Sequence, residues 1–172
     1  KRYFFHSIGL LLAVLLLASS LVSAQNAPVT SLGNADGCPG DTLTFPVSVN
    51  NFSQITAISL RIDFDPSKLT FVSLTNVNPA LTGSLYNTVN ASATLSKTLF
   101  MWSDMNPVTL PNDAILFELH YILNNGNPQL SFNNTDNLGG DCEYADAVGD
   151  PLNDLPTSTY YINGSATNNT PL

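Results

Sequence analysis

The sequence predicts an all-β protein, an antiparallel β-sandwich of about eight to nine strands. Apolar and polar residues alternate over short runs, which is typical of half-buried strands. Pro, Asn, Gly and Asp residues separate these runs and indicate turns. Beyond residue 24, no Pro-free stretch has the i, i+3, i+4 apolar spacing of a long helix. Because no helices are predicted that would cover a parallel sheet, an antiparallel sandwich fits best.

Three clear strands are predicted in the first part of the sandwich. Residues 43–49 (LTFPVSV) form the first, and Pro46 indicates an edge or a bulge because proline has no N–H to donate. Residues 58–64 (ISLRIDF) alternate strictly, so Ser59, Arg61 and Asp63 share the face opposite the apolar side chains. Residues 65–68 (DPSK) are a turn, and residues 69–74 (LTFVSL) return as the next strand.

The later strands are residues 98–104 (TLFMWSD), 114–123 (AILFELHYIL), 128–132 and 158–162. Between the two groups, residues 75–96 are weakly patterned and are expected to hold one or two short strands around Leu85 and Ala91. Residues 165–172 (SATNNTPL) are expected to be a flexible tail or the start of a linker. The predicted sandwich domain therefore spans residues 25–164.

The first 24 residues are typical of a secretory signal peptide. Lys1 and Arg2 precede the apolar residues 8–18, and small residues at 22–24 (VSA) indicate cleavage after Ala24. The apolar run is shorter than the about 20 residues that span a bilayer. We therefore expect a secreted or cell-surface protein with no membrane span in its mature form.

The charge balance excludes one class of partner. Residues 25–172 carry three basic and thirteen acidic side chains, a formal net charge of −10. Nucleic acids and anionic lipids bind clusters of Lys and Arg, so this chain is not expected to bind nucleic acid.

Two cysteines, Cys38 and Cys142, are expected to form a disulfide. Export places them in an oxidising compartment, where pairing is the default. Such a bond would close a long loop and stabilise the fold by about 4–5 kcal/mol.

No constellation of catalytic residues is predicted. After residue 24 the chain has one histidine, His120, in the middle of a strand, and no G-x-S-x-G motif. Acidic residues gather between 136 and 154, where Asp146 and Asp150 are weak candidates for a calcium site. Their spacing lacks most of an EF-hand loop, so a solvated turn is the favoured interpretation and no cofactor is expected.

Aromatic residues offer an alternative function, the binding of polysaccharide. Trp102, Tyr160 and Tyr161 would stack on sugar rings if they faced outward. Both faces of the strand around Trp102 are apolar, so alternation does not decide which face is buried. A single Trp in a sandwich more often packs in the core.

Four segments in order resemble the cohesin domain family. They are residues 40–47 (GDTLTFPV), 57–69 (AISLRIDFDPSKL), 99–103 (LFMWS) and 114–119 (AILFEL), and the resemblance covers roughly residues 35–163. It implies a jelly-roll sandwich of nine strands. It also implies a non-catalytic module of polysaccharide-degrading assemblies that grips dockerin domains with one flat sheet.

The resemblance also implies which residues contact the partner. Family members use polar positions on the strand before the Asp-Pro corner, which points to Ser59, Arg61 and Asp63 as the contact row. At positions where cellulosomal cohesins tend to carry Asn and Asp, this chain has Ala57 and Ser59. We therefore expect a divergent member that binds a dockerin-like or another protein partner, with a carbohydrate-binding module as the alternative.

Overall fold

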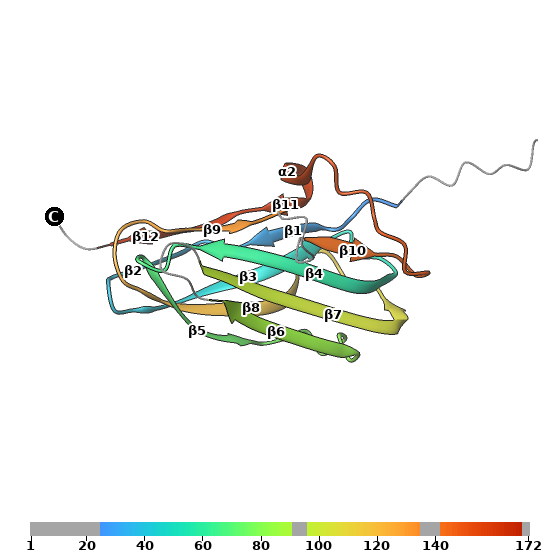
Figure 1. The fold of residues 1–172 in the computed structure, drawn as a ribbon, viewed down its shortest axis with the longest axis horizontal. Coiled ribbons are helices and arrows are strands. Elements are labelled where there is room, and N and C mark those ends of the chain that lie inside the picture. Colours follow the sequence, from blue (N-terminus) through green and yellow to red (C-terminus); the bar gives the residue numbers. More distant parts are fainter. Residues whose placement is uncertain (1–24, 91–95, 135–141, 170–172) are drawn as a thin grey trace, which may run out of the picture.

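The computed structural model describes residues 25–90, 96–134 and 142–169. Two β-sheets pack face to face in a jelly-roll sandwich (Figure 1). The five-stranded sheet has the order β11-β1-β3-β8-β5, and the seven-stranded sheet has the order β2-β12-β9-β4-β7-β6, with β10 also paired to β4. The strands, in chain order, are β1 (Val29–Leu32), β2 (Ala35–Gly37), β3 (Thr42–Asn50), β4 (Ile55–Phe64), β5 (Leu69–Thr75), β6 (Ser84–Asn90), β7 (Ser96–Val108), β8 (Ala114–Leu123), β9 (Gln129–Phe132), β10 (Glu143–Ala145), β11 (Tyr161–Ile162) and β12 (Gly164–Asn168).

The strands pair antiparallel with two exceptions, which join the two ends of the chain. Strand β1 pairs parallel to β11, and β2 pairs parallel to β12. Figure 1 shows this pairing, because the blue strands of the start lie beside the red strands of the end. Each sheet thus contains both early and late strands.

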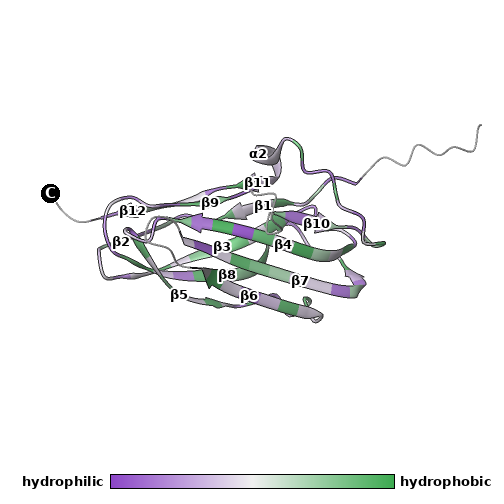
Figure 2. Ribbon diagram, viewed as in Figure 1, coloured by the Kyte–Doolittle hydropathy of each residue, from purple (hydrophilic) through white to green (hydrophobic). Residues whose placement is uncertain are grey.

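The core fills the space between the sheets with the apolar face of each strand. Phe45 and Val47 from β3 and Leu60 and Ile62 from β4 are fully buried. The alternation that predicted these strands is visible as bands along β4 (Figure 2). Aromatic rings join the two sheets: Phe100 of β7 stacks on Phe117 of β8 with 4.2 Å between the ring centroids. The predicted β-sandwich is confirmed.

The end of the domain differs from the prediction. Residues 158–162 were expected to be one strand, but a short helix, α2 (Thr157–Tyr160), precedes the two-residue β11. Residues 165–168, expected in a flexible tail, belong to β12 between β2 and β9. Ala166 is buried there, and its N–H donates to the carbonyl of Pro128 at 2.9 Å. The domain therefore extends beyond residue 164, because this polar segment fills a place in the sheet.

The predicted Cys38–Cys142 disulfide is wrong. Cys38 is exposed in the turn after β2. Strand β2 lies three strand spacings from β4 in the seven-stranded sheet, which is about 14 Å. Cys142 is buried against β4, where its sulfur lies 3.4 Å from both the nitrogen and the oxygen of the Arg61 backbone. A disulfide requires the sulfurs to approach to about 2 Å, which these positions do not allow.

The predicted signal peptide, residues 1–24, lies outside the described residues. Within the described ranges, no helix is long and apolar enough to cross a membrane.

Candidate functional site

The outer face of the seven-stranded sheet carries the predicted contact row, and two of its three members are enclosed. Ser59 is half-buried, whereas Arg61 and Asp63 are each only 7% exposed. The Arg61 guanidinium donates two hydrogen bonds to the Asp63 carboxylate, at 2.8 and 3.1 Å, and Asn133 donates a third at 2.5 Å. Arg61 and Asp63 therefore neutralise each other, and only Ser59 of the predicted row belongs to the open part of this face.

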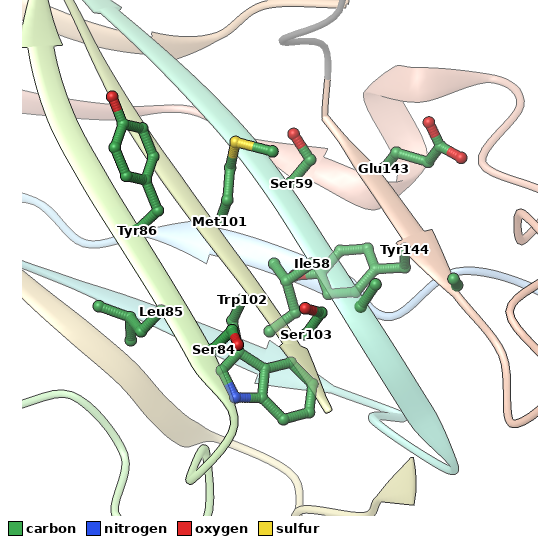
Figure 3. A pocket seen from close by; sticks show the side chains of 12 residues that line it. Ile58, Ser59, Ser84, Leu85, Tyr86, Met101, Trp102, Ser103, Glu143 and Tyr144 are labelled. Atoms are coloured by element: carbon green, nitrogen blue, oxygen red, sulfur yellow. The ribbon is translucent and has the colours of Figure 1, made fainter. Parts of the chain in front are cut away.

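Four strands supply the open part of the face, and their register places outward side chains in two rows. One row is small: Ala145, Ala57, Ser103 and Ser84 lie side by side across β10, β4, β7 and β6. The neighbouring row is taller at all positions but Ser59: Glu143, Ser59, Met101 and Tyr86 lie side by side across the same strands (Figure 3). The small row therefore forms a floor, and the taller row forms a wall along it.

A shallow groove of about 400 Å³ follows these rows. Met101 on β7 is 45% exposed, which is unusual for a side chain of this size away from the sheet edge, and Tyr86 on the edge strand β6 is 58% exposed. On the other side of Ser103 lies Met105, which is 96% exposed on the irregular part of β7. The groove is lined by Ala57, Ile58, Ser59, Ser84, Leu85, Tyr86, Met101, Trp102, Ser103, Glu143, Tyr144 and Ala145.

The structure decides which face of β7 is buried. Thr98, Phe100 and Trp102 face the core, and Leu99, Met101 and Ser103 face outward. Trp102 is only 2% exposed, so its ring has no open face for a sugar. Met101 was not predicted as a surface residue because apolar residues occupy both faces of this strand.

The two predicted tyrosines are not placed for sugar stacking either. Tyr161 is buried, and its ring packs parallel to that of Tyr144. Tyr160 ends the short helix α2 and is half-buried. The predicted trio of Trp102, Tyr160 and Tyr161 therefore does not form an exposed aromatic platform.

Asp146 and Asp150, the weak calcium candidates, organise a turn after β10. One carboxylate oxygen of Asp146 accepts the backbone N–H groups of Val148 and Asp150 at 2.9 and 3.0 Å. The backbone carbonyl of Asp146 accepts the hydroxyl of Thr56. Over the described ranges, no three His, Cys, Asp or Glu side chains gather as metal ligands. The carboxylate of Asp146 acts here as a local backbone cap.

His120 lies on the opposite side of the molecule, on the outer face of the five-stranded sheet. Its Nδ1 is 3.0 Å from the hydroxyl oxygen of Thr44, and its Nε2 is 2.7 Å from that of Thr75. Glu118 is 4.0 Å from Nε2. The imidazole thus bridges three strands, β3, β8 and β5, through their side chains.

Comparison with known proteins gives the family. A sequence model described as the cohesin domain matches residues 28–139. No curated protein matches the chain. Among solved structures, the cohesin CaCohA2 from Clostridium acetobutylicum is 22% identical with a TM-score of 0.62, over 84% of this chain and 92% of that one.

Two further structures show the same fold. A non-cellulosomal cohesin from the archaeon Archaeoglobus fulgidus is 18% identical with a TM-score of 0.58, over 81% of this chain and 89% of that one. The Coh-OlpA–Doc918 structure from Clostridium thermocellum, a type I cohesin–dockerin complex, is 16% identical with a TM-score of 0.60, over 82% of this chain and 98% of that one. These identities are low and show the fold alone. The cohesin family model matches more than half of the length of this chain, and the chain therefore belongs to the cohesin domain family.

Proposed function

We propose that this domain is a protein-binding module that recruits a dockerin-type partner through the groove on the seven-stranded sheet. One observation carries the proposal: the large side chains of Met101 and Tyr86 stand exposed beside a row of small residues on the outer face of the seven-stranded sheet. Exposed apolar patches of this kind mark interaction surfaces, and aromatic residues and Met are enriched in protein interfaces. The cohesins in related complexes are described with dockerins, which supports the same class of partner here.

The proposal includes the absence of catalysis. His120 is held between two threonine hydroxyls on the sheet face opposite the groove. His120 therefore has a structural role as a cross-strand contact to Thr44 on β3 and Thr75 on β5. This role supports a binding module rather than an enzyme.

We further propose that the module acts outside the cell in an assembly that degrades polysaccharide. The signal-like layout of residues 1–24 supports export. Direct binding of polysaccharide by Trp102, Tyr160 and Tyr161 is less favoured, because Trp102 and Tyr161 are buried.

Calorimetric titration of the purified protein with a panel of dockerin domains, with calcium present, tests the proposal. We expect at least one to bind, and Met101→Asp to weaken that binding at least tenfold, because the groove then presents a desolvated charge. Val72→Asp is the matched control: Val72 is 48% exposed, close to the 45% of Met101, but lies on β5 in the other sheet. Failure of every dockerin to bind, or equal loss in both variants, would exclude the proposed function.

A further inference from the structure

The free edge of the seven-stranded sheet, along β6, has the features of an interaction surface that is separate from the groove. We infer that two copies of this chain pair antiparallel along β6, about a twofold axis at Asn87, so that their seven-stranded sheets join into one. The inference goes beyond the proposed function, because its partner is a second copy of this chain and its contact is the edge of the sheet rather than the face.

The backbone of β6 is engaged on one side only. In the part of the chain that the structure describes, β6 pairs with β7 and with no other strand, and it lies at the border of the sheet (Figure 1). No backbone hydrogen bond joins residues 84–90 to a described residue outside β7. Because successive residues of a strand turn their N–H and C=O groups to opposite sides, about half of these groups on β6 point away from β7. They can pair with a further strand.

Strand β6 lacks the devices that usually protect an open edge, which are charged residues, proline, bulges and short length. The edge strand β5 of the other sheet has a register shift between Phe71 and Ser73. The strands at the opposite borders, β2 and β11, have three and two residues. In contrast, β6 (SLYNTVN) has seven residues, no charge, no proline and an unbroken register with β7. In a protein with many more acidic than basic residues, this uncharged edge is a place where two copies can meet without repulsion.

The sequence of β6 is complementary to itself, which identifies the partner as a second copy. When Asn87 lies opposite Asn87 of the second copy, Leu85 lies opposite Val89 and Tyr86 lies opposite Thr88. Apolar side chains then meet each other, and an aromatic ring meets a β-branched side chain, which are favourable cross-strand pairs. The nearest registers that keep both faces aligned would set Asn87 opposite Leu85 or Val89. The register centred on Asn87 therefore fits best, and it has the twofold symmetry of an isologous dimer.

The exposure of Leu85 shows what the pairing covers. Leu85 lies opposite Trp102, a core residue of β7, so its side chain points to the inner side of the sheet. It is nevertheless 39% exposed, because β6 has no described strand beyond it. Val89, four residues further along the strand, shares this inner side. In the dimer, Val89 of each copy contacts Leu85 of the other, and about six to eight backbone hydrogen bonds form between the two β6 strands.

A charge swap at the twofold axis tests the inference. Sedimentation velocity of the purified protein over a wide range of concentration should show a dimer that dissociates on dilution. A reductant is present throughout, so that the exposed Cys38 cannot link two copies. Asn87→Lys and Asn87→Asp should each raise the dissociation constant at least about fivefold, because like charges directly opposite each other destabilise a strand pair. An equal mixture of the two variants should dimerise again, with one copy of each.

The control is Thr42→Lys, because Thr42 is also exposed on a strand but lies on β3 of the other sheet. It should leave the dissociation constant of the wild type unchanged. Asn87 is exposed, so both of its variants should fold, and the fluorescence of the buried Trp102 checks this.

Recovery of the dimer in the mixture supports the inference, because it requires residue 87 of one copy to face residue 87 of the other. A wild type that stays monomeric at every concentration overturns it. Single variants that dimerise as tightly as the wild type, or a mixture that dimerises no better than the single variants, also overturn it. None of these results depends on the binding of a dockerin, which tests the proposed function on its own.

Discussion

The buried pair of Arg61 and Asp63 gives a quantitative prediction for Asp63→Asn. The Arg61 guanidinium and the Asn133 amide both donate to the same oxygen, Oδ2, while the Arg61 Nε donates to Oδ1. An Asn side chain has one oxygen and one NH2 group. In either orientation, the NH2 group would therefore face an N–H donor of Arg61 or Asn133 at the place of one carboxylate oxygen. The substitution also removes the Asp63 carboxylate as a counter-charge for Arg61, which is only 7% exposed.

Breaking one partner of a buried ion pair costs about 3–5 kcal/mol. We expect Asp63→Asn to lower the free energy of unfolding by about 3 kcal/mol, the low end of this range, because the oxygen of Asn still accepts one hydrogen bond. At about 3 °C per kcal/mol for a domain of this size, the melting temperature should fall by about 9 °C.

Urea unfolding followed by the fluorescence of Trp102 measures this loss, because Trp102 is the one tryptophan and is buried. Asp150→Asn is the control, since the Asp150 side chain is exposed. A free energy of unfolding for Asp63→Asn within about 0.5 kcal/mol of the wild type would refute the pairing.

Three further predictions follow from the fold. Cys38 should react with a thiol reagent in the native protein and Cys142 only after unfolding; absence of both thiols in unreduced, unfolded protein would instead indicate a disulfide. Gly164→Ala should destabilise the fold by about 1–3 kcal/mol, because the added methyl would lie 2.4 Å from the Gly33 carbonyl oxygen; an unchanged urea midpoint would contradict the place of β12 in the sheet. The stability that the buried tyrosines Tyr121, Tyr144 and Tyr161 contribute should be fully present below pH 10 and be lost above it. The reason is that tyrosines ionise near pH 10 in the unfolded chain, whereas burial raises their pKa in the folded one. Phenolate absorbance that rises near pH 10 from every tyrosine, without unfolding, would contradict this prediction.

The sandwich was predictable from the sequence because its main strands bury one face and leave the other polar. Strand β4 is the clearest case, with Leu60 and Ile62 facing the core and Ser59 on the other face. Strand β12 was missed because its segment, GSATN, buries one apolar side chain, Ala166. Its place depends on hydrogen bonds to distant loops, such as that from the Ser165 N–H to Asn34 Oδ1 at 2.9 Å.

The groove was harder to predict than the fold. Its two rows are assembled from four strands that are far apart in the chain, and only their register brings Glu143, Met101 and Tyr86 together. The pair of Arg61 and Asp63, in contrast, carried a local signal. Opposite charges two residues apart lie on the same face of a strand and can bind each other, so the sequence favoured an internal pair as much as a contact row.

Amide chemical-shift mapping of the protein with a dockerin domain that binds tests the central claim most directly. We predict that the largest shifts fall on the groove, at Ser59, Met101 and Tyr86. Amides of the five-stranded sheet around His120 should remain unchanged. Shifts concentrated on β3, β8 and β5, with the groove unchanged, would contradict the account and place the binding face on the other sheet.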